Sequence, residues 1–283
     1  ESAQYAHVYL PAGTWAEKEG VMTNTERRIN LVKPLTPPPG TAKPDLWIFN
    51  RVAERFNRDA KMKFPEKAAD IFLEMGELSR GRLADISGMN HDLIEKNRGI
   101  QWPYTAAQRE RGEAPPQGGK RLYTADGEFR YPDGRAKLIP LPFIDNNEVP
   151  DGNFPVWLNT GRLIEHWHGR TKTGKIGNNN KFSPIPFIEI NPDLADELGV
   201  QRGEYVRMVS RRGDAVAMAQ PTQRVPKNMV FLPFHFFDCA NRLTLGLLDP
   251  HSRQPAYKQS AIRIEKIADQ IAAAKLSMEM RNF

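Results

Sequence analysis

The sequence is short of cysteine and of long apolar runs. Cys239 is the single cysteine among 283 residues, which excludes an internal disulfide, a cysteine-ligated cluster and a CxxC metal site within this chain. No apolar run approaches the roughly 18 residues that a membrane-spanning helix needs, so we expect no membrane span. The first residues, ESAQYAHVYLP, lack the basic start and apolar centre that are typical of a signal peptide.

A block of like charge is also absent. Lys and Arg number 40 against 34 Asp and Glu, which gives a formal net charge of +6 at pH 7. The two signs are interspersed, and no run is long enough to indicate a nucleic-acid arm, so we expect no nucleic-acid partner. The mild excess of cations is compatible with an anionic ligand. The length is enough for two domains.

The first half of the chain combines a short strand with amphipathic helices. We predict a strand at 7–10 and an irregular connection at 35–45, because its prolines fix φ and remove backbone donors. Asp45 is the natural N-cap of a helix that runs to Phe56, and a second helix is predicted over 65–79. The apolar residues spaced along one face of each helix are expected to be buried: Leu46, Phe49, Val52, Ala53 and Phe56 in the first, and Ala69, Phe72, Leu73, Met75 and Leu78 in the second.

Weaker signals follow up to the middle of the chain. We predict a short helix at 91–97, a loop at 108–121, and a hairpin or small β-meander over 121–141, where turn residues interrupt an alternating pattern. Residues 143–155 combine Asn, Asp, Pro and Gly without periodicity. We interpret this last segment as the domain boundary.

After this boundary, short β runs separated by turns dominate the sequence. We predict a single helix between them at 191–200, with Asn191 as its N-cap and Gly199 at its end. Strands at this spacing with little helix are typical of a β-barrel or a sandwich. Residues 268–283 favour a helix that packs on a partner or frays.

The densest polar pattern lies at 156–175, VWLNTGRLIEHWHGRTKTGK. Glycine after a strand lets the backbone approach a ligand closely, and the N–H groups exposed at such a turn favour anions. Arg162 can grip a phosphate with two hydrogen bonds, and Trp167 and His166 can stack on a heterocycle. The pattern indicates a nucleotide-like ligand with a pyrophosphate.

Two other interpretations of this stretch stay open. His166 and His168 would lie on one side of a strand, as in a metal site, although no further ligands follow at a recognisable spacing. Alternatively, Trp167 belongs to the core and the cations around it form a solvated rim. Near the end of the chain, Cys239 has His235 close by in sequence, but nothing supplies the third group that orients a nucleophile, so a buried structural thiol is favoured.

Three segments, in this order, closely resemble one protein family. They are LPAGTWAEKEGVMTNTERR at 10–28, NTGRLIEHWHGRTKTG at 159–174 and ANRLTLGLLDPHSRQPAYKQSAIRIEKI at 240–267. Together they are similar to the C-terminal part of the molybdopterin oxidoreductases that use bis-molybdopterin guanine dinucleotide (bis-MGD), which include nitrate reductases and formate dehydrogenases. The resemblance runs from about Ala6 to Ile267.

The resemblance implies an α/β segment of a molybdopterin oxidoreductase followed by a six-stranded double-psi β-barrel, the molybdopterin dinucleotide-binding domain. Residues 1–145 would be the C-terminal portion of the α/β domain, with a helical insert and a hairpin. Residues 153–266 would form the barrel and 267–283 a helical tail.

The resemblance also implies which residues hold the cofactor. The loop after the first barrel strand would bind one MGD unit, with Arg162 near phosphate and His166 and Trp167 against the pterin. Asp45 would accept a hydrogen bond from guanine, and Phe234 would shape the substrate funnel. No catalytic residue or metal ligand is implied in this chain. The implied cofactor-binding residues are Lys18, Asp45, Thr160, Gly161, Arg162, Leu163, Glu165, His166, Trp167, His168, Gly169, Asn241 and Lys258.

The family's 4Fe-4S cysteines and molybdenum ligand belong to an N-terminal half without a counterpart in this sequence. The implied cofactors are bis-MGD with molybdenum or tungsten, and a 4Fe-4S cluster in that half. The implied partners are the N-terminal half, or a companion chain that supplies it, and an electron-transfer protein or subunit. We expect a cytoplasmic location, whereas an upstream twin-arginine signal would indicate the periplasm.

The branch of the family decides the predicted reaction. Residues 77–103 and 121–142 look most like assimilatory nitrate reductases, whereas TGRLIEHWH at 160–168 is shared with formate dehydrogenases. We therefore predict a nitrate reductase, which reduces nitrate to nitrite with two electrons. A formate dehydrogenase is the first alternative, and a non-catalytic module that binds the pterin cofactor is the second.

Overall fold

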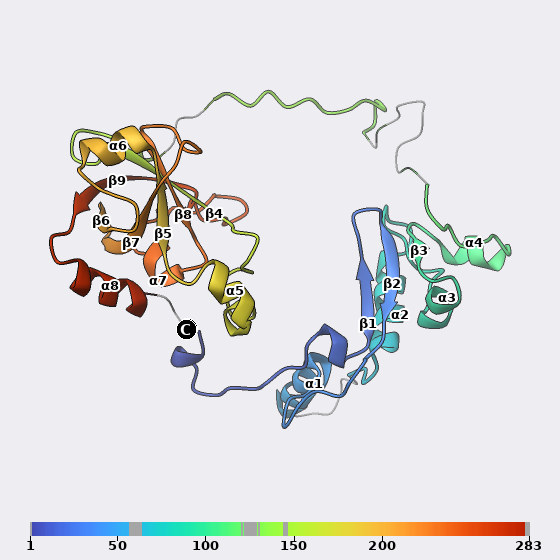
Figure 1. Ribbon diagram of the computed structural model, residues 1–283. Coiled ribbons are helices and arrows are strands. Elements are labelled where there is room, and N and C mark those ends of the chain that lie inside the picture. Colours follow the sequence, from blue (N-terminus) through green and yellow to red (C-terminus); the bar gives the residue numbers. More distant parts are fainter. Residues whose placement is uncertain are drawn as a thin grey trace. The chain divides into compact units, whose positions relative to one another are not determined.

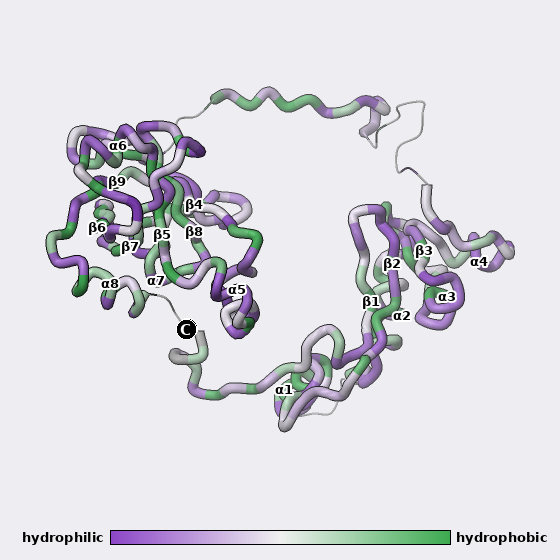
Figure 2. The backbone as a smooth tube through the Cα atoms, in the orientation of Figure 1, coloured by the Kyte–Doolittle hydropathy of each residue, from purple (hydrophilic) through white to green (hydrophobic). Residues whose placement is uncertain are grey.

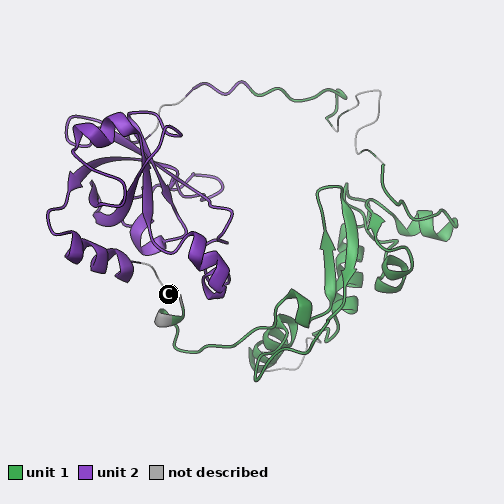
Figure 3. Cartoon of the chain, viewed as in Figure 1, with its two compact units in different colours: residues 1–139 green, residues 140–283 purple. Residues whose placement is uncertain are grey.

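The computed structural model describes residues 2–56, 64–119, 121, 129, 131–143 and 147–280. The chain forms two compact units, unit 1 at residues 1–139 and unit 2 at residues 140–283 (Figures 1 and 3). The limits implied by the resemblance, at 145, 153 and 266, stay predictions. None of the helices in the described ranges combines the length and the apolar character that crossing a bilayer requires.

Unit 1 is built on a small antiparallel sheet in the order β1-β2-β3. Helices α2 and α3 pack on β1 and β2. The core of this unit contains Ile29, Phe72, Ile86, Met89, Ile94, Ile100 and Tyr104. Its elements are η1 (Ser2–Tyr5), η2 (Trp15–Glu17), β1 (Gly20–Thr23), β2 (Arg28–Val32), α1 (Asp45–Phe56), α2 (Ala68–Ser79), α3 (His91–Lys96), β3 (Ile100–Gln101) and α4 (Ala106–Glu110).

The two predicted amphipathic helices form, but most of their apolar side chains are in solvent. Phe49 and Phe56 of α1 are 70% and 81% exposed, and Leu78 of α2 is 70% exposed, whereas Phe72 is buried. The prediction that one face of each helix is buried is therefore wrong for most of its residues. An amphipathic pattern reports which face can be buried, and tertiary contacts decide whether it is.

Asp45 is the first residue of α1 and not its N-cap. The carbonyl of Pro44 accepts the first helical hydrogen bond, from the N–H of Ile48 at 3.1 Å. The carboxylate of Asp45 is instead paired with the ammonium group of Lys18. The prediction of Asp45 as the N-cap is therefore wrong by one position, because the residue whose carbonyl accepts the first helical hydrogen bond is Pro44.

Three other predictions for unit 1 have mixed outcomes. The strand predicted at 7–10 does not form, because Val8 and Tyr9 are exposed and no strand pairs with them. The helix predicted at 91–97 is confirmed as α3, whereas α4 falls partly within the predicted loop and begins at a capping box of Thr105 and Gln108. Part of the hairpin predicted at 121–141, residues 122–128 and 130, lies outside the described residues, and the described part, residues 121, 129 and 131–141, contains no strand.

Unit 2 is a closed barrel of six strands in the order β4-β8-β5-β7-β6-β9, which confirms the expected barrel. The pairs β4–β8 and β5–β7 are parallel, and the other pairs are antiparallel. Closure leaves no free strand edge. The strands are β4 (Val156–Gly161), β5 (Phe187–Ile190), β6 (Tyr205–Ser210), β7 (Asp214–Pro221), β8 (Met229–Pro233) and β9 (Gln259–Lys266).

The barrel encloses a continuous apolar core that includes Leu158, Ile188, Met208, Leu232 and Ile262, each almost fully buried. Figure 2 shows hydrophobic stretches along several of its strands. Short helices surround the barrel and contribute Ala195 of α6, Cys239 of α7 and other residues to this core. They are η3 (Thr173–Lys175), α5 (Gly177–Phe182), α6 (Pro192–Glu197), α7 (Phe237–Ala240) and α8 (Gln270–Glu279).

The two predicted helices of unit 2 differ in outcome. For α6 the prediction is confirmed: the Asn191 side chain accepts from the Asp193 N–H, and Gly199 ends the helix region with φ of 63°. The tail helix, α8, packs on β6 and β7, and Ala273 and Ser277 of this helix are buried together with Met280, which follows it. The tail helix therefore does not fray over its described residues, and its packing on a partner stays a prediction.

Candidate functional site

The loop that follows β4 begins at Gly161, where the neighbouring strand leaves little space for a side chain. A Cβ atom on Gly161 would lie 2.4 Å from Cε2 of Phe231 on β8, well inside the contact distance that a carbon atom allows. The carbonyl of Gly161 accepts from the N–H of Phe234 at 3.0 Å. The loop therefore leaves the barrel at a point that β8 fixes closely.

A buried imidazole connects the two ends of this loop. Nε2 of His235 accepts from the N–H of Leu163 at 2.8 Å, and Nδ1 contacts the carbonyl of His168. Because a carbonyl only accepts, Nδ1 carries the proton and the ring is neutral. His235 is fully buried, and burial lowers its pKa from the ordinary value, which favours the same neutral form.

A second buried imidazole has the opposite tautomer. Nε2 of His166 donates to the carbonyl of Ser183 at 2.8 Å. Nδ1 accepts from the hydroxyl of Thr173 at 3.2 Å, and that oxygen accepts from the N–H of Trp167. Burial lowers the pKa of His166. The rings of His166 and His235 are 5.8 Å apart, so two neutral imidazoles support one loop.

The alternative of a His-x-His metal pair on a strand is wrong. The segment from Arg162 to Gly169 is not a strand, and its two histidines occupy different environments, since His166 is 5% exposed while His168 is on the surface with φ of 43°. Across the described residues, no three side chains of His, Cys, Asp and Glu converge as a metal site would need.

A buried arginine completes the support of the loop. Arg170 is fully buried with φ of 67°, its guanidinium lies 4.8 Å from the ring centre of Phe236, and it donates to Oδ1 of Asn180 at 2.6 Å. The neighbouring Asn179 donates to the carbonyl of Glu165 at 2.5 Å. The loop is therefore tied to α5 by side-chain amides.

The exposed rim of the loop is cationic and aromatic. The guanidinium of Arg162 lies 5.2 Å from the ring centre of Phe234, and the ammonium of Lys258 lies 5.7 Å from it. The ammonium of Lys172 lies 4.6 Å from the ring of Trp167, which is 48% exposed. Cations with their charge near water beside flat rings can attract an anion that carries a heterocycle.

The implied cofactor residues of unit 2 divide into supporting and exposed positions. Thr160 is 2% exposed and donates its hydroxyl to the carbonyl of Tyr257 at 2.7 Å, while the ammonium of Lys258 reaches the Thr160 carbonyl at 3.4 Å. Asn241 is exposed at the C-terminal end of α7. The positions near the loop are Thr160, Gly161, Arg162, Leu163, Glu165, His166, Trp167, His168, Gly169, Phe234 and Lys258.

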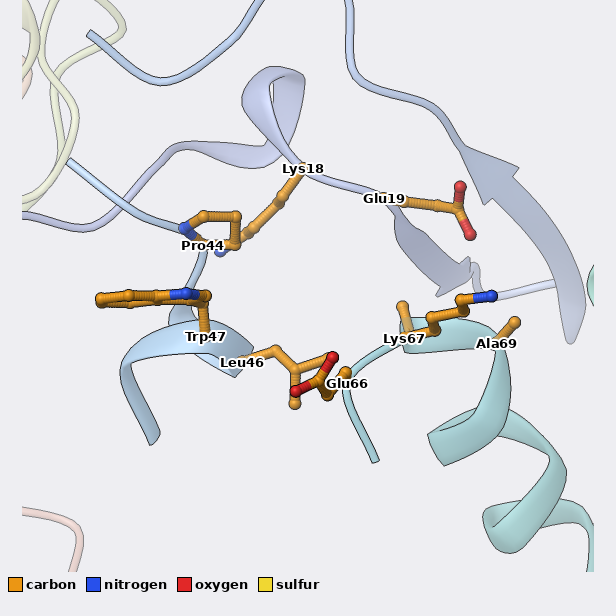
Figure 4. Close-up of a pocket in the computed structure, with 9 residues that line it drawn as sticks. Lys18, Glu19, Pro44, Leu46, Trp47, Glu66, Lys67 and Ala69 are labelled. Atoms are coloured by element: carbon orange, nitrogen blue, oxygen red, sulfur yellow. The ribbon is translucent and has the colours of Figure 1, made fainter. Parts of the chain in front are cut away.

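In unit 1, the structure brings Lys18 and Asp45 into an ion pair. The hydrogen bond from Lys18 lowers the pKa of Asp45, so its carboxylate stays ionised. Lys18 lines a hollow of about 410 Å³ together with Pro44, Trp47 and Lys67, and Figure 4 shows the Trp47 ring at its edge. The pair is partly exposed and is open to a polar ligand.

Sequence reasoning missed the supporting residues His235, Arg170, Asn180 and Ser183. For His235 a signal existed, because it is a histidine inside the apolar run VFLPFHFF, where a polar side chain needs hydrogen-bond partners.

Cys239 is fully buried, and burial raises the pKa of its thiol to about 12. The interpretation of Cys239 as a structural thiol is therefore confirmed.

Unit 2 is thus a closed six-stranded barrel whose first strand opens into a cationic, aromatic loop. Residues 156–261 match the molydopterin dinucleotide binding domain, and residues 1–55 match the molybdopterin oxidoreductase family. The chain belongs to the molybdopterin oxidoreductases.

Relatives of this chain include enzymes of two kinds. The alpha subunit of an F420-dependent formate dehydrogenase from Methanocaldococcus jannaschii is 36% identical over 94% of this chain and 38% of its own length. A nitrate reductase from Synechocystis sp. is also 36% identical over 94% of this chain and 38% of its length. A third relative, a nitrate reductase from Symbiobacterium thermophilum, is 34% identical over 94% of this chain and 36% of its length.

Among solved structures, acetylene hydratase from Pelobacter acetylenicus is similar in fold. The TM-score is 0.62 at 16% sequence identity, and the match covers 94% of this chain and 39% of that one. This chain therefore spans between 36% and 39% of the length of each of these proteins.

Proposed function

We propose that this chain supplies the dinucleotide-binding barrel of a molybdopterin-dependent oxidoreductase whose cofactor is bis-MGD with molybdenum or tungsten. The observation that carries the proposal is the loop after β4. It lies within the residues that match the dinucleotide-binding domain, its backbone is held by buried groups, and its rim presents Arg162, Lys172 and Lys258 beside aromatic rings.

The residues present fit such a cofactor by their chemistry. A pyrophosphate needs cationic donors, which Arg162 and Lys258 supply, and a pterin or guanine offers a flat face for Trp167. The ionised Asp45 of unit 1 can accept from the N–H edge of guanine. When bound, bis-MGD supplies the redox chemistry and the protein supplies binding and orientation.

For the reaction, we propose the reduction of nitrate to nitrite, in which two electrons and two protons remove one oxygen as water. The likeness of residues 77–103 and 121–142 to assimilatory nitrate reductases supports this choice, and two of the relatives are nitrate reductases. Formate oxidation is the second candidate, because the formate dehydrogenase subunit matches the same share of this chain at 36% identity.

The proposal extends to the partners of the chain. A portion of the enzyme that precedes the matched part of the relatives, on this polypeptide or on a companion chain, would carry the 4Fe-4S cluster and the metal ligand. An electron-transfer protein or subunit would exchange electrons with that cluster. We propose a cytoplasmic enzyme, and cell fractionation that finds the activity in the periplasm would overturn this location.

The deciding experiment is purification of the native assembly from its source, followed by intact mass, metal and pterin analysis and assays with nitrate and formate. We expect molybdenum or tungsten, iron and guanine-bearing pterin, together with nitrate reduction by a low-potential donor. Formate oxidation without nitrate reduction would select the second candidate. A chain that holds MGD by itself, without iron and without either activity, would indicate the non-catalytic module instead.

A further inference from the structure

We propose that His235 is a positioning residue that presets the loop at 162–169 for the dinucleotide. The inference rests on the proposed function, because it concerns the loop that would hold the cofactor. His235 itself lies beneath that loop, fully buried.

The place of His235 is fixed by the barrel and not by the loop. It lies in the short turn between β8, which pairs with β4 and β5, and α7, and the next residue, Phe236, is fully buried in the barrel core, so the barrel holds the backbone on both sides of His235. One ring nitrogen accepts from the N–H of Leu163 at 2.8 Å and the other donates to the carbonyl of His168. A single side chain therefore fastens two loop residues that are five positions apart.

Both fastened residues are neighbours of the exposed groups that would meet the ligand. Leu163 follows Arg162, and His168 follows Trp167. The φ of 43° at His168 is costly for a residue with a side chain and persists only where surrounding contacts hold it. The hydrogen bond at the carbonyl of His168 is such a contact, so His235 fixes Arg162 and Trp167 before a ligand arrives and lowers the cost of ordering them.

The test uses the full chain and three variants. His235→Phe keeps a ring but removes both hydrogen bonds, and His235→Gln keeps one acceptor and one donor. Ile188→Val is the matched control, because it changes a fully buried core residue on β5. Amide hydrogen exchange of residues 162–169 reports the loop, and GDP, which contains guanine and a pyrophosphate, is the binding probe, read from the indole N–H signal of Trp167.

In His235→Phe we expect the Leu163 amide to exchange at least about tenfold faster and the Kd for GDP to rise about tenfold, as the loss of two buried hydrogen bonds implies. His235→Gln should stay within about threefold of the wild type, because its amide replaces both bonds. Ile188→Val should leave the relative protection of the loop unchanged. Nitrogen-15 NMR of the wild type should show His235 neutral and protonated at Nδ1.

Equal loop protection in His235→Phe and Ile188→Val would overturn the positioning role, whatever GDP does. Faster exchange in His235→Phe together with a wild type that binds no GDP would overturn the proposed function and leave the fastening of the loop in place. If His235→Phe does not fold, the wild-type tautomer decides, and a ring protonated at Nε2 or at both nitrogens would overturn the proposal.

Discussion

Unit 2 places its apolar side chains inside a closed barrel, whereas unit 1 leaves most apolar side chains of its two longest helices in solvent. In the barrel, strands that are far apart in sequence pair around the whole circumference. The closed sheet therefore encloses the apolar side chains that point inward. The sheet of unit 1 has three short strands, which cannot cover two helices of 12 residues each. Unit 2 therefore buries its apolar side chains by itself, and we expect that the helices of unit 1 need additional protein surface to cover theirs.

The largest expected effect comes from separating the two units. Residues 140–283 expressed alone should melt cooperatively, because the barrel core lies wholly within them. Residues 1–139 expressed alone should bind a hydrophobic dye and melt without a sharp transition, because α1 and α2 expose large apolar side chains. Circular dichroism melts and dye fluorescence measure both. A sharp melt of residues 1–139 without dye binding would contradict the comparison.

Truncation of one leucine in each unit should give the next largest difference. Leu232→Ala on β8 removes a fully buried side chain, and we expect it to lower the free energy of unfolding by about 2–5 kcal/mol. Leu73→Ala on α2 removes a side chain that is 48% exposed and should change it by less than about 1 kcal/mol. Urea unfolding measures both, and equal costs would show that the two environments do not differ.

Gly161→Ala tests the closest approach in the barrel. The new Cβ would meet the Phe231 ring at 2.4 Å, and we expect a cost of about 1–3 kcal/mol from overpacking together with weaker GDP binding. Gly177→Ala is the matched control. Gly177 is the first residue of α5, and a Cβ atom added there would have no atom within 4 Å. Urea unfolding of both variants checks this. A neutral Gly161→Ala would mean that the Phe231 ring moves aside freely.

The two buried histidines predict a pH dependence for the barrel. Burial lowers the pKa of His166 and His235 in the folded chain. Above the ordinary pKa of about 6.5, both histidines are neutral in the folded and in the unfolded chain, so their contribution to the free energy of unfolding is at its full value. As the pH falls below that value, the unfolded state binds protons that the folded state does not, and the free energy of unfolding falls. Urea unfolding at pH 8, 6.5 and 5.5 measures the loss.

His235→Gln should show a smaller loss over the same pH range, because one of the two titrating groups is gone. The carboxylate of Glu148, whose pKa Arg212 lowers, should add its effect only at more acid pH, as the fold loses stability when the pH falls toward the lowered value. A free energy of unfolding that is constant between pH 7 and 5.5 would contradict the neutral assignment.

The smallest effect on stability is expected at the Lys18–Asp45 pair of unit 1. Its side chains are 33% and 44% exposed, so solvent screens the pair, and Asp45→Asn should cost less than about 1 kcal/mol. The same variant should nevertheless weaken binding of guanine nucleotides, because an amide no longer offers an ionised acceptor. Unfolding and GDP titration together measure this contrast, and a large loss of stability with unchanged binding would assign the pair a structural role only.

The sequence predicted the barrel and the place of the loop but not the support beneath it. Alternation and turn spacing indicated the strands of unit 2, and the glycine, Arg162 and Trp167 after the first of them indicated a ligand. His166 carried the same signal as Trp167, yet its ring is buried with both nitrogens engaged. Nothing in the spacing distinguishes a stacking histidine from one whose partners, Thr173 and Ser183, come from other turns.

The sequence by itself determined the family and some local elements, such as α6. Asn191 and Gly199 act within a few residues, so the ends of α6 follow from local backbone geometry. Only the tertiary structure decided which amphipathic faces are buried and which imidazoles are neutral. Those outcomes depend on residues that are 17 to 72 positions apart in the chain, such as His166 with Ser183 and His235 with Leu163, and burial and hydrogen-bond partners exist only after the barrel has closed.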